Sequence, residues 1–201
     1  MLEFLGGGLG EPSLHKEGSP DLTASDCEFV SPSLVRRLAI AGRKKFLALI
    51  IIALVVIIAD QVTKYLVTTF IPLHRGVEII PGFANLVHAR NPGAAFGIFA
   101  DSTSRLRSLF LLLVSVAALV CIIWIVVSSK QIDSYLLVGL SFFFGGATGN
   151  LVDRVRFGEV IDFVDVYVGS FHWPAFNVAD ASLCVGTAFL FLHFLLRKER
   201  I

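Results

Sequence analysis

Residues 108–127 read SLFLLLVSVAALVCIIWIVV, and this run contains no charged side chain. A helix of about 20 residues crosses the ~30 Å hydrocarbon layer of a bilayer, so the run is long enough and apolar enough to span a membrane. Of the 201 residues in the chain, 55% are hydrophobic and only 16% are charged. The composition therefore predicts a polytopic membrane protein and argues against a soluble domain.

Three further apolar runs are long enough to cross a membrane, at about 46–66, 134–152 and about 179–196. The chain is thus expected to be mainly α-helical with four transmembrane helices, which places both termini on one side. Lys and Arg near span ends mark the segments that stay in the cytoplasm. They lie before the first span, between the second and third, and after the fourth: Arg36, Arg37, Arg43, Lys44, Lys45, Lys130, Arg197, Lys198 and Arg200. Both termini are therefore predicted to be cytoplasmic, although the opposite loops also carry arginines.

The segments outside the spans differ in character. Residues 1–43 begin with a mixture of Gly, Pro, Ser and acidic residues and end in basic ones, which is typical of a disordered cytoplasmic tail. Residues 44–197 are predicted to form one four-span membrane domain, with outer loops at 72–105 and 153–178. The first outer loop contains two strand-like pieces, Val77–Ile80 and Ala84–Arg90, so we expect a small extracytoplasmic β-rich element there.

Several classes of function are disfavoured by composition and spacing. The net charge of +1 gives no general attraction for nucleic acid. Three widely spaced cysteines and histidines without HExxH spacing predict neither disulfides nor a metal site. The chain has no phosphate-binding loop and no serine or cysteine nucleophile motif, so we expect no cofactor.

Unusual polar residues gather at the predicted outer ends of the spans and in the outer loops: Asp60, Gln61, Lys64, Asn91, Asn150, Asp153, Arg154, Asp162, Asp165, Asn177 and Asp180. Ionisable groups at membrane depth are candidates for function. Asp60 and Lys64 have the i, i+4 spacing of a helix-stabilising ion pair, and the structural interpretation is favoured for them. Asp153 and Arg154 fit either a pair of boundary charges or a binding role.

Asp162 and Asp180 differ from the other carboxyls because each is embedded in apolar sequence, which raises the pKa of a carboxyl group. Two such groups brought together share one proton, so that one activates water and the other protonates a leaving amine. Spacing alone does not show that they meet, and Asp180 would also suit the start of a helix as a cap. The small residues Ser141, Gly145 and Gly149, at four-residue steps, predict close helix packing.

Five segments, taken in order, resemble the bacterial lipoprotein signal peptidases, also called signal peptidase II. They are DQVTK at 60–64, NPGAAFG at 91–97, GATGNLVDR at 146–154, VIDF at 160–163 and FNVAD at 176–180. Each segment alone is weak evidence for the family, but all five in this order on a chain with four spans are specific to it. The resemblance covers about residues 44–197 and leaves the N-terminal tail unexplained.

The resemblance implies an aspartic endopeptidase of the bacterial inner membrane that removes the signal peptides of prolipoproteins by cutting before a diacylglyceryl-modified Cys. It implies that Asp162 and Asp180 are the catalytic pair, with a water between them and the active site at the outer face. It assigns substrate positioning to Asn91, Asn150, Arg154 and Asn177, and an orienting role to Asp60 and Lys64; Asp153 is expected to be structural. Partners would be diacylglyceryl-modified prolipoproteins and membrane lipids, with no nucleic acid, no metal and a monomeric state.

Two other classes of function were compared with this one. An ion-coupled carrier would use outward carboxylates, a Lys and Asn residues, but it needs polar groups through both halves of the membrane, and the second and fourth spans carry almost none toward the cytoplasm. A purely structural subunit would not explain so many costly polar groups at one face. The length and glycine content of residues 72–105 also suggest a lid over the site.

Overall fold

The computed structural model describes residues 32–93, 104–129 and 132–198. The chain divides into two compact units, residues 1–39 and 40–201; helix α1 begins in the first, and the rest of the described structure belongs to the second. Four helices and four strands make up the described chain. The helices are α1 (Pro32–Phe70), α2 (Ser104–Ser128), α3 (Ser134–Phe157) and α4 (Val178–Lys198).

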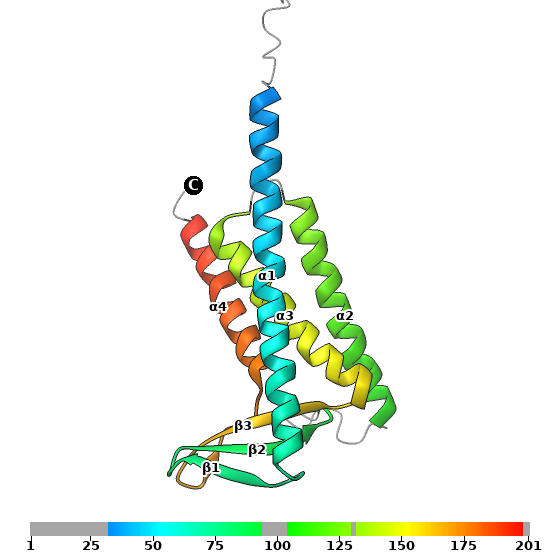
Figure 1. The fold of residues 1–201 in the computed structure, drawn as a ribbon, viewed down its shortest axis with the longest axis vertical. Coiled ribbons are helices and arrows are strands. Elements are labelled where there is room, and N and C mark those ends of the chain that lie inside the picture. Colours follow the sequence, from blue (N-terminus) through cyan, green and yellow to red (C-terminus); the bar gives the residue numbers. More distant parts are fainter. Residues whose placement is uncertain (1–31, 94–103, 130–131, 199–201) are drawn as a thin grey trace, which may run out of the picture. The chain divides into compact units, whose positions relative to one another are not determined.

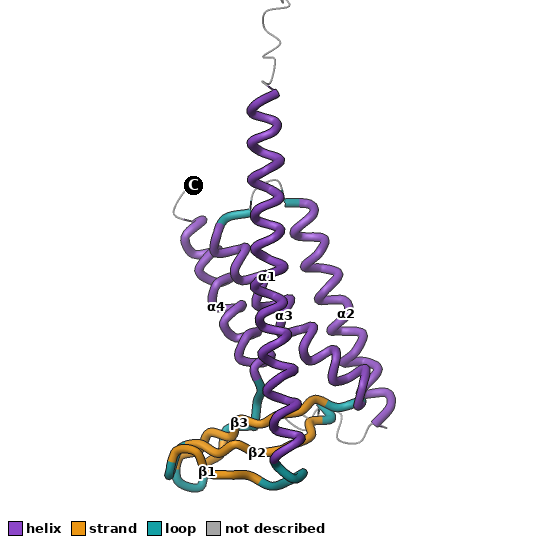
Figure 2. The backbone as a smooth tube through the Cα atoms, viewed as in Figure 1, coloured by secondary structure: helices purple, strands orange, loops and turns teal. Residues whose placement is uncertain are grey.

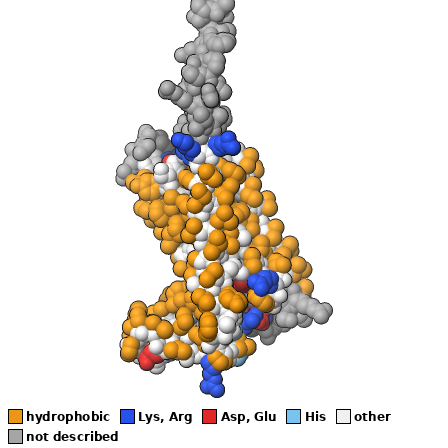
Figure 3. All heavy atoms as spheres, viewed as in Figure 1, with side chains coloured by type: hydrophobic (Ala, Val, Ile, Leu, Met, Phe, Trp, Pro, Cys, Tyr) orange, Lys and Arg blue, Asp and Glu red, His pale blue; other side chains and the backbone are white. Residues whose placement is uncertain are grey.

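Each helix contains a stretch long and apolar enough to cross a membrane: Arg43–Phe70, Leu106–Ser128, Ser134–Phe157 and Val178–Arg197. The prediction of four transmembrane helices is therefore confirmed. Hydrophobic side chains cover the visible sides of the helices, and Lys and Arg side chains gather at the end far from the sheet (Figure 3). A surface this apolar suits contact with lipid, because a soluble domain rarely exposes one so large.

Two boundaries differ from the predicted ones. α3 continues past residue 152 to Phe157, so Asp153 and Arg154 lie on the helix and not in the outer loop. Nothing in the sequence stops the helix before Gly158, which takes the left-handed conformation (φ 76°) and donates its N–H to Arg154 O. α1 begins at Pro32, inside the predicted tail, whose residues 1–31 lie outside the described chain.

The four strands form one antiparallel sheet in the order β1-β2-β3-β4. They are β1 (Gly76–Ile80), β2 (Ala84–Asn91), β3 (Val160–Val168) and β4 (Phe171–His172). The first two match the predicted strand-like pieces, so the β-rich element is confirmed. β3 was not predicted as a strand, yet it pairs with β2 from Ala84↔Val166 to Asn91↔Val160 and joins the two outer segments.

The sheet lies at the end of the bundle where α1 and α3 finish and where α2 and α4 start (Figures 1 and 2). α3 packs closely on its neighbours through glycines, as the small-residue spacing predicts. A Cβ added at Gly145 would come 2.7 Å from Val56 Cβ of α1, and one added at Gly146 would come 2.5 Å from Ala179 O of α4. Contacts this short leave no room for a side chain, so the glycines let α1 and α4 approach α3 from two directions.

Candidate active site

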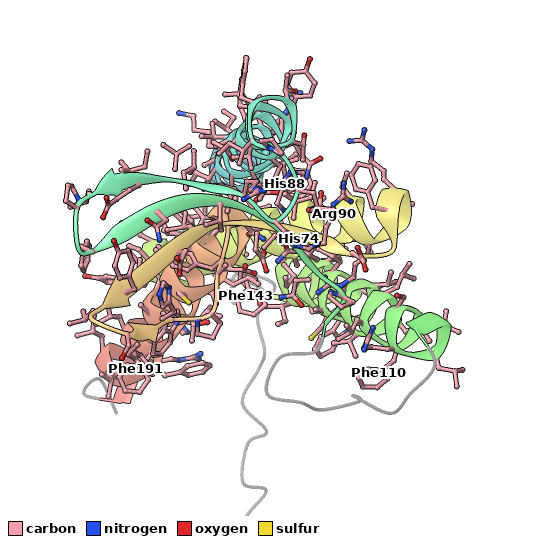
Figure 4. The ribbon with its side chains drawn as sticks, turned by 90° about the horizontal axis from the view of Figure 1, so that it is seen from below. His74, His88, Arg90, Phe110, Phe143 and Phe191 are labelled. Carbon is pink, nitrogen blue, oxygen red and sulfur yellow. The ribbon has the colours of Figure 1, made fainter. Side chains whose placement is uncertain are left out.

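The residues singled out from the sequence meet where α1, α3 and α4 reach the sheet. Asp60 and Lys64 come from α1, and Asn150, Asp153 and Arg154 from α3. Asn91 ends β2, Asp162 lies near the start of β3, and Asn177 and Asp180 flank the start of α4. Hydrogen bonds and ion pairs join them in one network. Figure 4 shows the molecule from the sheet end, where these elements meet.

Lys64 occupies the interior of this network. Its Nζ lies 2.8 Å from Asp60 Oδ2 and 2.8 Å from Asp153 Oδ2, and the three side chains are at most 2% exposed. The same nitrogen donates to Asn150 Oδ1 at 3.2 Å, so the ammonium group has three partners for its three protons. The predicted Asp60–Lys64 ion pair is confirmed.

The partner of Asp153 is Lys64 and not Arg154, its neighbour in sequence. Successive residues of a helix point about 100° apart, so adjacent side chains do not face one another. Asp153 Oδ2 also accepts the N–H of Ile161 at 3.2 Å, next to Asp162. Asp153 thereby ties the start of β3 to α3, which agrees with the structural role expected for it.

Gln61 belongs to the network although sequence reasoning gave it no role. The two protons of its Nε2 are shared among three acceptors, Asp60 Oδ2 at 3.2 Å, Asp153 Oδ1 at 3.1 Å and Gly149 O at 3.2 Å. The available signal was an amide directly after Asp60 at the end of an apolar run. Lys64 thus forms ion pairs with both buried carboxylates, and Gln61 donates hydrogen bonds to both.

The start of α4 is a capping box. Asn177 Oδ1 accepts the N–H of Asp180 at 2.9 Å, and Asp180 Oδ2 accepts the N–H of Asn177 at 3.2 Å. Asp60 Oδ1 accepts a further free N–H of this first turn, that of Ala179, at 2.9 Å. Asp180 therefore does help to start the helix, as the alternative interpretation held, but this uses only one of its two oxygens.

The other oxygen of Asp180 is connected to Asp162 by hydrogen bonds through the side-chain amides of Asn150 and Asn177. Asn150 Nδ2 donates to Asp180 Oδ1 at 2.7 Å, and Asn177 Nδ2 donates to Asp162 Oδ1 at 2.8 Å. Asn177 Nδ2 lies 3.2 Å from Asn150 Oδ1, which completes the bridge. Among the described residues no cation forms an ion pair with either carboxyl.

Asp162 is 2% exposed. Burial raises its pKa to about 6, the hydrogen bond from Asn91 opposes this, and the negative charge of Asp180 adds to the increase. Asn91 Nδ2 donates to Asp162 Oδ2 at 2.9 Å, while Asn91 Oδ1 accepts the N–H of Gly93 at 2.8 Å. Asp162 thus exchanges a proton near neutral pH, where a carboxyl in water would be ionised.

Arg154 lies beside this group without an ion pair of its own among the described residues. Its Nη1 makes long contacts, 3.4 Å to Asn150 O and 3.5 Å to Ser115 Oγ. The guanidinium is therefore weakly held and has donors to spare for another acceptor. Residues 94–97 of the NPGAAFG segment lie outside the described chain.

A family model described as signal peptidase (SPase) II matches residues 52–196. The chain belongs to the signal peptidase II family. Every predicted site residue lies inside the matched range. Within the described residues, no group of three or more His, Cys, Asp or Glu side chains is arranged to hold a metal ion.

Relatives and solved structures agree with the family assignment. A lipoprotein signal peptidase of Desulforapulum autotrophicum is 43% identical over 150 residues, covering 75% of this chain and 93% of the relative. One of Geobacter sulfurreducens is 45% identical over 145 residues, covering 72% and 88%. A solved structure described as a bacterial membrane enzyme, determined by the in meso method, has a TM-score of 0.66 at 36% identity and covers 74% of this chain and 92% of its own.

Proposed function

We propose that this protein removes the signal peptides of prolipoproteins, cutting before a diacylglyceryl-modified Cys, and that Asp162 and Asp180 perform the hydrolysis. Family membership supports the substrate class, because the relatives are lipoprotein signal peptidases. The observation that carries the assignment of the two carboxyls is their environment. They are joined by the Asn150–Asn177 bridge, and no ion-paired cation neutralises either one among the described residues.

Two carboxyls in this arrangement hold one proton between them. The ionised group takes a proton from a water molecule as the water oxygen attacks the scissile carbonyl carbon. The protonated group gives its proton to the carbonyl oxygen, which forms a tetrahedral intermediate. The intermediate collapses with cleavage of the C–N bond as the carboxyl that took the water proton gives it to the leaving nitrogen. The other carboxylate takes back a proton from a hydroxyl group of the intermediate, so the pair again holds one proton. The pKa of about 6 for Asp162 keeps a proton available near neutral pH.

The polar residues around the pair are proposed to hold the substrate and the carboxyls. The weakly bound Arg154 guanidinium has free donors for a peptide carbonyl. Asn91, Asn150 and Asn177 already contact the carboxyls and keep their oxygens oriented. Asp60 accepts the N–H of Ala179, and Lys64 donates to Asn150 Oδ1. These two residues therefore hold the start of α4 and the Asn150 amide in place.

The setting of the reaction is also proposed. Basic residues near the span ends favour a bacterial inner-membrane protein with cytoplasmic termini, which puts the sheet and the active site at the outer face. A substrate whose signal helix already lies in the bilayer would reach this end of the bundle from the side. We propose a monomer, because the network that surrounds Asp162 and Asp180 is built from this one chain.

The test is cleavage of a diacylglyceryl-modified prolipoprotein by the purified full-length protein in detergent, read by mass spectrometry. Asp162→Asn and Asp180→Asn should each reduce turnover by about 10²–10⁴-fold, the usual contribution of general acid–base groups. Asp165→Asn is the matched control, since this carboxyl lies on the same strand but bonds Asn85 and His172 instead. It should keep turnover within about twofold of wild type.

Near-normal turnover of folded Asp162→Asn or Asp180→Asn would contradict the assignment of the pair. Failure of well-folded wild type to cut the prolipoprotein would contradict the proposed substrate. A product cut elsewhere than immediately before the lipidated Cys would contradict the proposed cleavage position.

A further inference from the structure

Two arginines from different elements converge on one aromatic ring outside the active-site network. The guanidinium carbons of Arg90, from β2, and Arg156, from α3, each lie 4.9 Å from the centre of the Phe157 ring. Cation–π attraction accounts for each contact singly. Neither guanidinium group forms an ion pair or a hydrogen bond with another described residue, so two positive charges share one ring without a carboxylate.

The dipole of α3 explains only half of this arrangement. Arg156 lies in the last turn of α3, where a cation is favoured by the partial negative charge of the helix C-terminus. Arg90 reaches the same helix end from strand β2, but a partial charge of about −0.5 at that end offsets only part of two full positive charges. Figure 4 shows Arg90 beside the end of α3. Mutual repulsion of two guanidinium groups would be relieved by an anion that binds to both.

The place of the pair in the fold indicates the kind of anion. Phe157 ends the membrane-spanning part of α3 and is 43% exposed, and Tyr65 of α1 is 67% exposed. Aromatic and basic side chains at the end of a span mark the depth of the lipid headgroups. A hollow of about 60 Å³ opens beside this pair. Its outer lining includes Tyr65, Thr68, Arg156 and Phe157, and its inner lining is formed by Gln61, Lys64, Asp153 and Ile161.

Apolar surface adjoins the charged pair on the bundle side. Val62 of α1 is 50% exposed and Val155 of α3 is 67% exposed. Figure 3 shows Lys and Arg side chains beside the hydrophobic surface of the helices, near the sheet. A ligand that matches both features has a phosphate at one end and hydrocarbon chains at the other.

We propose that Arg90, Arg156 and Phe157 bind the phosphodiester headgroup of an anionic phospholipid, with the acyl chains on the apolar surface of α1 and α3. Planar guanidinium groups hold phosphate oxygens by paired hydrogen bonds, which suits them to this ligand. The site is separate from Asp162 and Asp180 and takes no part in the proposed hydrolysis.

The test is native mass spectrometry of the full-length protein released from nanodiscs that contain equal amounts of dioleoylphosphatidylglycerol and dioleoylphosphatidylcholine. Wild type should retain the phosphatidylglycerol adduct in preference to the phosphatidylcholine adduct. The double variant Arg90→Gln/Arg156→Gln should lose at least about tenfold of this preference, and each single variant a smaller part. Arg75→Gln is the control, because Arg75 is exposed at the sheet end but contacts no aromatic ring.

Unchanged phosphatidylglycerol retention in the double variant would overturn the proposal, as would an equal loss in Arg75→Gln. Glycerophosphate without acyl chains should not displace the lipid at millimolar concentration. Full displacement would show that a free phosphate ester is the ligand and would overturn the assignment to a lipid. The single variants, with the thermal unfolding temperature of each measured beside wild type, keep the test decisive if the double variant does not fold.

Discussion

Two pairs of carboxyl groups lie in the same network, and they differ in what surrounds them. Asp60 and Asp153 share the ammonium group of Lys64, 2.8 Å from each. Asp162 and Asp180 are reached only by amide and backbone N–H groups among the described residues. Among the described residues, only the first pair has a cation between its members.

In the second pair, burial raises the pKa of Asp162, and we propose that this pair holds a proton in place of a cation. The first pair holds α1, α3 and the start of β3 together, and the proposed role of the second pair is to transfer protons. Asp60, Asp153 and Asp162 are each at most 2% exposed and Asp180 is half-buried, so the position of one lysine, and not burial alone, distinguishes the two pairs. The predictions below act on this difference.

Lys64→Met should have the largest effect on stability. It leaves Asp60 and Asp153 buried without a cation, which costs about 3–5 kcal/mol when one partner of a buried ion pair is removed. Thermal unfolding in detergent measures the loss. Lys44→Met, at an exposed position of α1, is the matched control and should unfold like wild type. Equal stability of both variants would show that Lys64 does not hold the first pair.

The pH dependence of kcat/KM tests the second pair. Asp162 has a pKa of about 6, so the shared proton is lost as the pH rises through that value and both carboxyls ionise. We expect kcat/KM to fall about tenfold per pH unit above the pKa of the pair. In Asn91→Ala the hydrogen bond that lowers the pKa of Asp162 is lost, so the fall should begin at higher pH. A flat profile between about pH 5 and pH 8 would contradict a shared proton.

Gly149→Ala should damage the first pair through packing alone. The added Cβ would come 2.6 Å from Asp60 Oδ2 and 3.2 Å from Ala179 Cβ, so Asp60 must move away from its partners. Overpacking of this kind costs about 1–3 kcal/mol. Urea or thermal unfolding measures it, and an unfolding midpoint equal to that of wild type would mean that α1 and α3 can separate without loss.

Asp133→Ala, at the opposite end of α3, should have the smallest effect. Asp133 caps the helix by accepting the N–H of Leu136 at 2.9 Å and also contacts His193 Nδ1 of α4, so loss of the cap and of this half-exposed contact costs about 1–2 kcal/mol. Turnover should stay at the wild-type level, since neither carboxyl pair is touched. Asp133→Asn keeps a capping oxygen and should lose less stability than Asp133→Ala. Reduced turnover in either variant would show that the Asp133 end of α3 affects the active site, contrary to this prediction.

Much of the fold could be predicted because the membrane imposes simple rules. A span needs about 20 apolar residues, so 108–127 and its three counterparts were recognisable from hydropathy alone. The strands β1 and β2 followed from their residue pattern and the Pro81–Gly82 turn. β3 was missed because its pairing partner, β2, lies far away in the sequence. The end of α3 was placed too early because charged residues at a span end resemble a loop, although Arg154 and Arg156 continue the helix to Phe157.

The candidate site was predictable as a set of residues and not as a geometry. Apolar flanks singled out Asp162 and Asp180, and their ordered motifs gave the family. That Asp180 is both a capping residue and a neighbour of the Asn150–Asn177 bridge could not be seen, because the bridge joins α3, β3 and α4. The role of Gln61 could not be predicted either, because its partners Gly149 and Asp153 belong to another helix.

The sequence by itself determined the four spans, the positions of the polar residues at their ends and the family, since these depend on local hydropathy and on short ordered motifs. Only the tertiary structure decided which carboxyls share a cation. Lys64 can reach Asp60 within its own helix, but its contact with Asp153 exists because Gly145 and Gly149 let α1 approach α3. The partner of a buried charge is set by how closely two backbones approach, and no single segment of the chain contains that information.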